Sequence, residues 1–349
     1  DHRTLLFFAK APMNVVIFRP IVERLRRDPR LEMHFTGFYD VPGDPKSLYA
    51  RFGMEGERLV RAGLLTSLRR YDLYLSPDMY LLARRARAKA HLFHGVSFKG
   101  KAYSDQVLRY DRLFLVGEDM RRRFIQRGIL KEGDRRLAKI GMPKTDPLVN
   151  GSLDRAAILK KMNLDPSRKT VLYAPTWRPE ASLYHLGREL IPQLARGEFN
   201  FLVKLHDLVY TDSRVDWRQE MAKLEGGNFR LITDFDITPY LFVTDVLISD
   251  ASSVANEFLL LDRPIVFLDC PELLKKYEAT ADLETWGRKT GTVVASAAEF
   301  WKALDDSLRN PQCMSETRRQ AAADIFYNPG TATDRAVEEC YRLLRLAPP

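Results

Sequence analysis

Two histidines stand where an acid–base catalyst would be expected. His94 follows a short apolar run at residues 90–93, and His206 ends the apolar stretch FLVKLH. Such runs predict buried strands, so both imidazoles are expected at strand ends, the place for a general acid or base. A lone histidine at a strand end is more often a solvated bystander. A matching pair from the two halves of the chain is a better candidate, and we predict a catalytic role for both.

Two further residues follow the first histidine closely. Gly95 lets the backbone turn, and Lys99 adds a cation a few residues later, within the segment HGVSFKG. We expect Gly95 and Lys99 to contribute to binding of the acceptor or of a phosphate group.

A cluster of short polar residues separates two apolar runs at residues 246–248 and 264–268. The cluster consists of Ser249, Asp250, Ser252 and Ser253. A helix that contains Glu257 is predicted to follow, with Ser252 or Ser253 as its N-cap. In a strand–turn–helix–strand unit this turn lies at the carboxyl end of a parallel strand, where free amides favour an anion. Simple capping of the helix is the alternative interpretation.

Two other segments offer cations to an anion. In VLYAPTWRP a predicted strand ends at Pro175, so Thr176 and Arg178 would project from the strand end, and arginine suits a phosphate. A surface arginine beside the half-buried Trp177 is the alternative. In NPGTATDRAVE, a helix start with Arg335 on its first turns is predicted to offer amides and a cation to an anion.

Metal and nucleotide motifs are weak or missing. Asp234 and Asp236 spell a DxD pattern, but a predicted helix follows directly, which favours capping over metal binding. Neither GxxxxGK[ST] nor GxGxxG is present, so a P-loop and a dinucleotide fingerprint are not supported. We therefore predict no protein-bound metal and no required cofactor, although a soluble divalent ion could assist.

Positive charge is concentrated in the first half of the chain. Residues 1–165 carry 33 Lys and Arg against 19 Asp and Glu, a net +14, whereas residues 166–349 carry 22 against 27, a net −5. Such a surplus indicates attraction to an anionic surface or polymer. No nucleic-acid-binding motif accompanies the basic clusters, so we expect an anionic membrane surface and no nucleic acid as partner.

The composition is that of a globular protein. The 349 residues are 45% apolar, and no run approaches the roughly 18 apolar residues of a membrane span. The opening TLLFFAKAP lacks the length and flanks of a signal peptide and predicts a first strand. The three cysteines have no metal-like spacing, which favours a reducing cytoplasm. Because the chain begins at Asp1 without methionine, further segments could flank it.

Short apolar strands alternate with amphipathic helices throughout, which predicts an α/β fold with two doubly wound, Rossmann-like domains. We expect sheets of five or six strands each, facing each other across a cleft. The polar segment at residues 150–169 predicts the boundary, with residues 1–150 as the basic, acceptor- and membrane-facing domain and residues 151–349 as the nucleotide-donor domain. The final predicted helix, at residues 333–344, is free to pack back on the first domain.

The order of these motifs resembles the CDP-glycerol glycerophosphotransferase family of teichoic-acid polymerases and primases. The resemblance covers residues 90–340 and is carried by HG with a following lysine, GMPKTD, LYAPTWR, KLH, DITPYLFVTDVLISDASS, LDRPIVF and GTATDR. It implies two Rossmann-like domains in a GT-B arrangement, action at the inner face of the cell membrane, and transfer of glycerol phosphate from CDP-glycerol to a polyol-phosphate acceptor with release of CMP.

By position, the resemblance implies His94 and His206 as the catalytic histidines. It also implies that Ser249, Asp250, Ser252, Ser253 and Arg335 lie at the nucleotide diphosphate. The chain departs from the family pattern at Ala251, at Asp207 and in HGVS, where the family usually has Tyr, Pro and HGTP. Asn256-Glu257 also replaces the more usual Phe-Asp. These departures leave the transferred polyol and the base open.

The resulting hypothesis is phosphoryl transfer from a CDP-polyol to a polyol-phosphate or lipid-linked acceptor in teichoic-acid or capsule-like polymer synthesis. His94 acts as the base, and His206, Arg335 and the turn amides steady the diphosphate, with Lys99 or Arg178 as further cations. One alternative is a GT-B glycosyltransferase that uses a nucleotide sugar and an acidic residue such as Glu257. Another is a catalytically idle module that binds a membrane or a polyanion.

Overall fold

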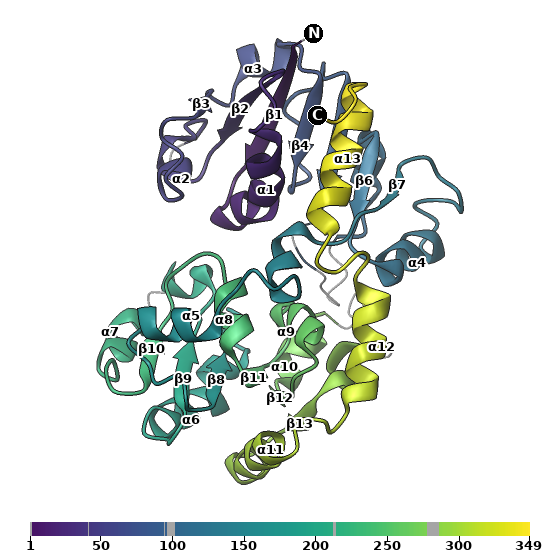
Figure 1. Ribbon diagram of the computed structural model, residues 1–349. Helices are drawn as coiled ribbons and strands as arrows, with labels where there is room; N and C mark the ends of the chain where they lie inside the picture. Colours follow the sequence, from purple (N-terminus) through teal and green to yellow (C-terminus); the bar gives the residue numbers. More distant parts are fainter. Residues whose placement is uncertain (1, 41, 94, 96–101, 212–213, 278–285) are drawn as a thin grey trace. The chain divides into compact units, whose positions relative to one another are not determined.

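The computed structural model describes residues 2–40, 42–93, 95, 102–211, 214–277 and 286–349. Within these residues the chain forms two compact units (Figure 1). Unit 1 comprises residues 2–95, 102–146 and 324–349, and unit 2 comprises residues 147–323. The change of unit after Asp146 lies near the boundary at residue 150 that the sequence predicts. The last 26 residues, Asp324–Pro349, belong to unit 1.

Unit 1 contains a parallel sheet in the order β3-β2-β1-β4-β5-β6-β7. Its strands are β1 (Arg3–Ala9), β2 (Leu31–Gly37), β3 (Arg58–Leu59), β4 (Leu73–Ser76), β5 (Ala88–Leu92), β6 (Arg112–Leu115) and β7 (Leu137–Lys139). The helices are α1 (Pro12–Leu25), α2 (Lys46–Ala50), α3 (Leu64–Leu68), η1 (Asp105–Arg109), α4 (Glu118–Gln126), η2 (Pro143–Leu148) and α13 (Ala332–Leu344). Residues 5–9 of β1 are fully buried, as a central parallel strand requires.

Unit 2 contains a second parallel sheet in the order β10-β9-β8-β11-β12-β13. Its strands are β8 (Thr170–Tyr173), β9 (Asn200–Val203), β10 (Phe229–Leu231), β11 (Val246–Ser249), β12 (Ile265–Leu268) and β13 (Thr292–Val294). The helices are α5 (Arg155–Lys161), η3 (Ser182–Tyr184), α6 (Leu186–Leu194), η4 (Asp207–Thr211), α7 (Trp217–Ala222), α8 (Thr238–Val243), α9 (Val254–Phe258), η5 (Leu259–Leu261), α10 (Pro271–Lys275), η6 (Gly287–Thr290), α11 (Ala297–Arg309) and α12 (Ser315–Ile325).

The predicted fold class is confirmed, and the sheets are close to the predicted size. Seven and six strands form where five or six each were expected. The two unpredicted strands, β3 and β13, lie at sheet edges and have only two and three residues. Both strands are largely exposed, and a strand whose faces are not buried needs no continuous apolar run. Their sequences therefore carry little signal.

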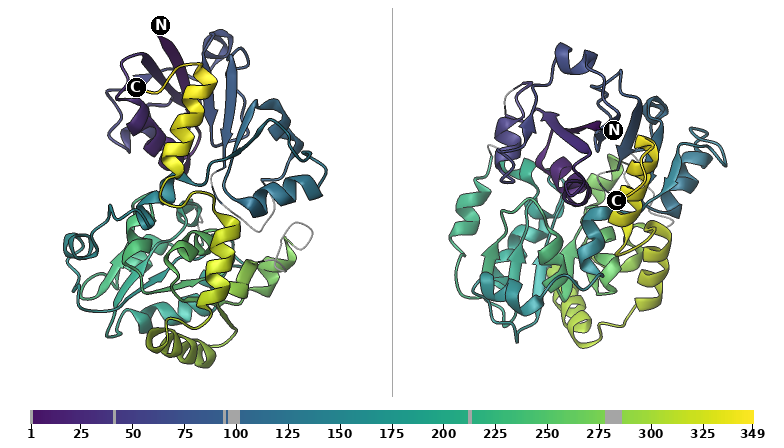
Figure 2. Two further views of the ribbon diagram at one scale, coloured as in Figure 1. Left: turned by 45° about the vertical axis from the view of Figure 1, so that its right-hand side comes forward. Right: turned by 45° about the horizontal axis from the view of Figure 1, so that its top comes forward.

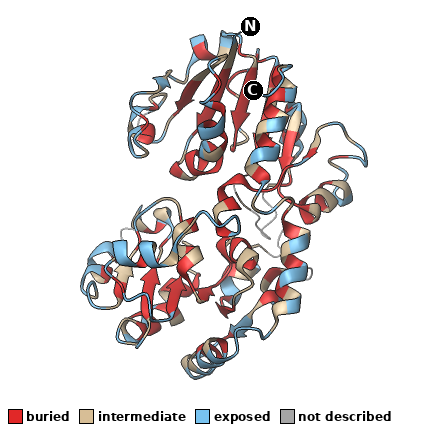
Figure 3. Cartoon of the chain, in the orientation of Figure 1, coloured by how far each residue is buried: buried red, intermediate tan, exposed pale blue. Residues whose placement is uncertain are grey.

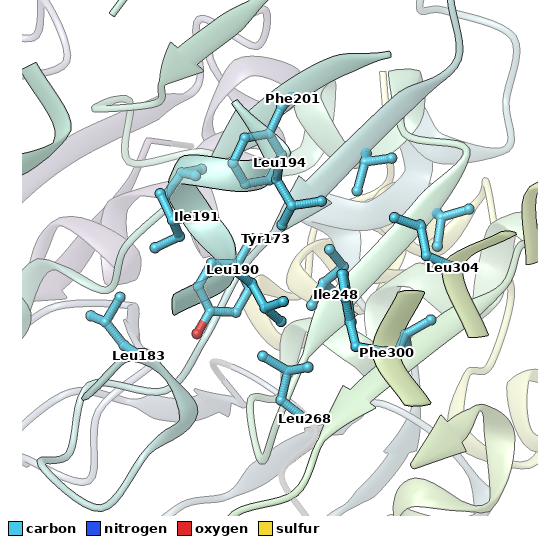
Figure 4. Close-up of a cluster of buried hydrophobic side chains, with 14 of the residues drawn as sticks. Tyr173, Leu183, Leu190, Ile191, Leu194, Phe201, Ile248, Leu268, Phe300 and Leu304 are labelled. Atoms are coloured by element: carbon cyan, nitrogen blue, oxygen red, sulfur yellow. The ribbon is translucent and has the colours of Figure 1, made fainter. Parts of the chain in front are cut away.

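The core of unit 2 explains how its strand ends are held. Tyr173, Ile248 and Leu268, from three neighbouring strands, pack with α6 and α11 through Leu190, Leu194, Phe300 and Leu304 (Figure 4). The four central strands β9, β8, β11 and β12 are buried, whereas the outer faces of the helices are exposed (Figure 3). A close-packed sheet of this kind gives the loops at its carboxyl edge a rigid base.

The C-terminal segment completes unit 1. Helix α13 packs beside α1 and β4, as the views of Figure 2 show in yellow. Arg122 of α4 pairs with Asp324 at 2.7 Å, and the hydroxyl of Tyr341 donates to Asp28 at 2.9 Å. Unit 1 is therefore built from two stretches of chain that are far apart in the sequence.

Candidate active site

In unit 2 the direction of the strand order reverses between β8 and β11. Strands β9 and β10 follow β8 on one side, whereas β11, β12 and β13 extend on the other. Loops that leave the carboxyl ends of such a pair diverge, and open parallel sheets bind ligands at this position. Three segments with predicted site residues lie at this edge of the sheet: residues 174–178 after β8, His206 after β9, and residues 249–253 at the end of β11.

The carboxylate of Asp250 joins two of these segments. Asp250 is fully buried and accepts hydrogen bonds from the amide of Thr176 at 2.9 Å and from its own neighbour Ala251 at 2.6 Å. Its second oxygen accepts from the amide and the hydroxyl of Ser182, at 3.1 and 2.8 Å. Because four donors already surround this carboxylate, its role in the geometry is to position the β8 loop. Contact of Asp250 with a diphosphate remains a prediction.

The serines of the turn differ in what they can offer. Ser249 is fully buried, and its hydroxyl donates to the carbonyl of Ala174 at 2.8 Å. Ser253 occupies the N-cap position of α9, but its side chain makes no capping hydrogen bond, so the predicted side-chain cap is wrong for this residue. Its backbone is already helical, with φ −63° and ψ −17°, rather than extended as a capping serine requires. Ser252 and Ser253 are half-buried.

Some backbone amides at this turn already donate hydrogen bonds within the protein. Those of Ala255 and Asn256 donate to the carbonyls of Ser252 and Ser253, at 3.3 and 3.1 Å. Helix α9 has only five residues. An anion at this point would therefore meet the turn itself rather than the end of a long helix.

Arg178 has a fixed guanidinium group and a donor that could bind an anion. Its guanidinium lies over the ring of Trp177, 4.2 Å from the ring centroid. Its Nε is buried and has no hydrogen-bond partner among the residues that the structure describes. A buried donor of this kind needs an acceptor. Nearby, a hydrogen bond from Lys276 and the charge of Arg178 hold the pKa of Glu180 below its ordinary value.

His206 is exposed at the end of β9, next to this loop. Its ring lies 6.2 Å from that of Trp177, measured between centroids. Its Nδ1 accepts a hydrogen bond from the amide of Leu208 at 3.2 Å. In the neutral imidazole the proton is then on Nε2, which makes Nε2 a hydrogen-bond donor. Asp207 begins η4 and lies 3.5 Å from the ammonium of Lys204.

Thr176 and Glu257 are buried behind these groups. Thr176 is 3% exposed and is bound through its amide to Asp250. Glu257 is 3% exposed on α9. Glu257 follows the turn closely in the chain, whereas Thr176 reaches it through its hydrogen bond to Asp250. The predicted contacts of both residues with the nucleotide remain predictions.

In unit 1 the predicted catalytic segment can be followed only in part. Gly95 is half-buried and comes three residues after the end of β5. His94 and Lys99 lie outside the described residues. The roles of these three residues therefore remain predictions.

Arg335 lies on α13, in unit 1. It is exposed and pairs with Glu338 at 3.0 Å. The sequence predicts that free amides at the start of this helix bind an anion. This prediction is wrong for Ala332 and Thr333, because their amides donate hydrogen bonds to the carboxylate of Asp146, at 3.0 and 2.7 Å. The helix start is thus capped from within the protein. Binding of a diphosphate by Arg335 itself remains a prediction.

Two features of the sites were not predicted from the sequence. Ser182, which binds Asp250 twice, lies in an ordinary polar stretch. In unit 1, the strand order reverses between β1 and β4, and there Lys10 pairs with Asp78 at 2.9 Å. Both residues follow the ends of apolar strands, which is the signal that could have identified them.

The acidic residues that the structure describes do not gather into a metal site. Among the described residues, no group of three or more His, Cys, Asp or Glu side chains could hold a metal ion. In the DxD pattern, Asp236 accepts from the amide of Thr238 at 2.9 Å at the start of α8, and Asp234 accepts from the hydroxyl of Tyr240. These are the local hydrogen bonds of a helix start.

The family model for CDP-glycerol:poly(glycerophosphate) glycerophosphotransferases matches residues 85–341, and the chain belongs to this family. Among its curated relatives, the teichoic acid glycerol-phosphate primase of Bacillus subtilis is 32% identical over 197 residues, which is 55% of this chain and 44% of the relative. A teichoic acid poly(ribitol-phosphate) polymerase of Bacillus spizizenii is 26% identical over 231 residues, 59% of this chain and 36% of the relative. The chain therefore spans less than half the length of these relatives.

Solved structures show the same fold. The wall teichoic acid polymerase TagF matches with a TM-score of 0.69 at 18% identity, over 98% of this chain and 89% of that chain. A Staphylococcus aureus MnaA structure with UDP matches with a TM-score of 0.61 at 13% identity, over 99% of this chain and 98% of that chain. These similarities establish the GT-B-like fold of two parallel sheets.

Proposed function

We propose that the protein transfers a polyol phosphate, with glycerol phosphate as the first choice, from a CDP-polyol to a polyol-phosphate or lipid-linked acceptor, and that CMP is released. Membership of the family supports the reaction class. The single structural observation that carries the proposal is the meeting of Arg178, His206 and the Ser252–Ser253 turn at the reversal of strand order in unit 2.

The reaction requires one bond to form and one to break. An acceptor hydroxyl oxygen attacks the phosphorus that bears the polyol, and a new phosphodiester bond forms. The bond from this phosphorus to the bridging oxygen of the diphosphate breaks, and CMP leaves with that oxygen. The hydroxyl proton passes to a base, for which His94 is our candidate.

The leaving side needs positive charge and hydrogen-bond donors. The Nε2 proton of His206 and the Nε of Arg178 supply two donors in the loops that follow the neighbouring strands β9 and β8. The amides of Ser252 and Ser253 and the guanidinium of Arg335 are further candidates. Asp250, through Thr176 and Ser182, keeps the β8 loop in place.

The proposal includes the cellular setting that the charge distribution suggests. Unit 1 contains most of the basic first half of the chain, and we propose that it faces an anionic acceptor and the inner face of the cell membrane. None of the described helices combines the length and apolarity needed to cross a bilayer. With this set of donors, we propose that no bound metal or cofactor is required.

Release of CMP from CDP-glycerol is the direct test. Purified protein with CDP-glycerol and a polyol-phosphate acceptor should release CMP, and His94→Ala should lose nearly all turnover while its unfolding temperature and its stabilisation by CDP are unchanged. Wild-type turnover in His94→Ala would remove this residue from the mechanism.

A donor comparison distinguishes the glycosyltransferase alternative. Thermal shifts with CDP, UDP and GDP should show the largest stabilisation with CDP. Larger stabilisation by UDP or GDP, with sugar transfer in place of CMP release, would establish the alternative.

A further inference from the structure

The most exposed apolar side chains of the described residues lie together on one short helix of unit 1. Leu64, Leu65 and Leu68 of α3 are 74%, 87% and 50% exposed. Thr66 is the buried residue of this helix, and its hydroxyl donates to the carbonyl of Arg61 at 2.6 Å. The helix is thus anchored by its polar residue, whereas its leucines face solvent. Such an inversion costs free energy unless another apolar phase covers the leucines.

Helix α3 lies at the amino edge of the sheet of unit 1. It leads directly into β4, and Asp72, immediately before this strand, accepts from the amide of Thr4 near the start of β1 at 2.9 Å. The start of β1 and the end of α13 lie at the same edge, since Arg3 donates to the carbonyl of Leu344 at 3.2 Å (Figure 1). This edge is opposite to the one that carries Lys10 and Gly95.

Arginines line the same edge. Strands β4, β5, β6 and β7 are neighbours in this order, about 4.8 Å apart, and each begins beside at least one arginine. The end of α13 contributes two more. The arginines are Arg69, Arg70, Arg84, Arg85, Arg87, Arg112, Arg135, Arg136, Arg342 and Arg345.

The acidic groups on this edge are fewer, and each is already engaged. Asp111 pairs with Lys89 at 3.4 Å, and both carboxylate oxygens of Asp134 accept from the Nη1 of Arg136, at 3.1 and 2.8 Å. Glu339 binds Arg112 and Arg342. Among the described residues, no carboxylate pairs with Arg70, Arg84, Arg85, Arg135 or Arg345.

A groove connects the starts of the last three strands with the end of α13. It has a volume of about 530 Å³. Six of its lining residues are arginines, and its single acidic residue is Asp111. A groove of this composition is large enough for a phosphate group and its substituents, and guanidinium groups bind phosphate oxygens in pairs.

We propose that this amino edge, comprising α3 and the arginine groove, is the surface by which unit 1 docks on an anionic phospholipid bilayer. The leucines of α3 enter the interface between headgroups and acyl chains, and the arginines bind the headgroup phosphates. The inference names the membrane-binding face within the proposed function, but it does not depend on the chemistry of transfer. Since β5 has five residues, or about 17 Å, the carboxyl edge of this sheet stands roughly that far from the bilayer.

Vesicle sedimentation tests the two components separately. The full chain is mixed with vesicles of phosphatidylcholine alone or with about 30% phosphatidylglycerol, at about 0.1 M and about 0.5 M NaCl. Binding should be on the order of tenfold tighter to the anionic vesicles and should weaken at high salt. The doubles Leu64→Ser/Leu65→Ser and Arg135→Glu/Arg345→Glu should each lower the partition coefficient by on the order of tenfold.

Matched changes elsewhere serve as controls. Val293→Ser changes an exposed apolar residue of unit 2, and Lys160→Glu/Arg196→Glu makes the same charge change on exposed residues of unit 2. Both controls should bind anionic vesicles within about twofold of the unmodified protein, since neither lies at the amino edge of unit 1. Thermal unfolding of every variant should show that it is folded. We expect this because the altered side chains are exposed.

Loss of vesicle binding in both doubles, with binding retained by the controls, supports the proposal. Unchanged vesicle binding by the leucine double, or equal binding to neutral and anionic vesicles, overturns it. If the leucine double binds normally but the arginine double loses binding to soluble polyphosphate, the surface is a site for a soluble polyanion instead. If CDP does not raise the unfolding temperature of the unmodified protein but vesicle binding is observed, the proposed function is wrong and the docking surface still stands.

Discussion

At the level of single residues, the Asp250 carboxylate and the Arg178 guanidinium have opposite surroundings. All four hydrogen bonds to Asp250 come from the protein, whereas the Nε of Arg178 lacks an acceptor among the described residues. Buried polar groups are normally satisfied. The carboxylate is therefore suited to hold the loop, and the guanidinium is suited to bind something that the protein does not supply.

Asp250→Asn should destabilise unit 2 without a direct effect on the ligand. Asparagine has the same shape, but its amide nitrogen would face backbone donors where a second oxygen now accepts. We expect a loss of about 1–3 kcal/mol in the free energy of unfolding, measured with urea. Ser182→Ala, which removes only one hydroxyl donor, should cost less. Full stability of Asp250→Asn together with loss of CDP binding would show instead that Asp250 contacts the diphosphate.

Arg178→Lys should weaken binding of the nucleotide. Lysine keeps the positive charge but lacks the Nε donor and the planar group that stacks on Trp177. We expect roughly tenfold weaker binding of CDP by calorimetry, with unchanged unfolding. Arg188→Lys, on the exposed face of α6, is the matched control. Equal affinity of both variants for CDP would exclude Arg178 from the site.

His34 should make unit 1 sensitive to acid. The side chain is buried, and its Nδ1 has no hydrogen-bond partner among the described residues. Burial, with a smaller effect of Arg69, lowers the pKa of His34 from 6.5 to about 4. Glu32, 2.9 Å from Nε2, acts in the opposite direction but is also bound to Arg58.

The sign of this effect follows from the lowered pKa. Between pH 6.5 and pH 4 the unfolded chain binds the proton more readily, so stability is lost as the pH falls through this window. Unfolding temperatures at pH 7 and pH 5 should therefore differ less for His34→Gln than for the unmodified protein. An equal difference in both proteins would assign the acid sensitivity to other groups.

At the level of elements, the start of α13 depends on a distant turn. Asp146, at the end of the first stretch of unit 1, caps this helix through two backbone amides. Burial raises the pKa of Asp146, and these hydrogen bonds act against the rise. The cap joins residues that are 186 and 187 positions apart in the chain.

Asp146→Ala should loosen this junction. Loss of an N-cap side chain costs about 1–2 kcal/mol in the free energy of unfolding. Hydrogen exchange at Ala332 and Thr333 should accelerate, whereas Asp334→Ala, an exposed change in the same helix, should leave exchange at these amides nearly unchanged. Unaltered exchange in Asp146→Ala would mean that water replaces the cap at no cost.

For the whole molecule, the two units differ in how the chain builds them. The core of unit 2 comes from one continuous stretch, from Val171 to Leu304. Unit 1 requires α13, whose Cys340, Tyr341 and Leu344 are buried. Since an exposed apolar surface on the sheet is costly, unit 1 needs both of its segments.

Separate expression of the segments tests this difference. A fragment of residues 147–323 should unfold cooperatively, as followed by circular dichroism, whereas residues 1–146 alone should lack a cooperative transition. Addition of a peptide of residues 324–349 should restore structure to the second fragment. A cooperative transition of residues 1–146 without the peptide would show that α13 is dispensable for this unit.

Much of the fold follows from the sequence: the fold class, the central strands of both sheets and the polar turns that follow them. A buried parallel strand needs a continuous apolar run, and the polar residues after it are visible in the chain. The family motifs are also visible in the sequence, because each is a short continuous stretch of the chain.

Which polar side chains are available to a ligand depends on the folded protein. It buried Asp250 beneath four donors, used Asp146 to cap α13 and left the leucines of α3 exposed. These outcomes depend on partners that are distant in the chain, such as Ser182 for Asp250 and Ala332 for Asp146. Local patterns of hydrophobicity carry no information about such partners, because the hydrogen bonds arise only when the sheets bring separate strand ends together.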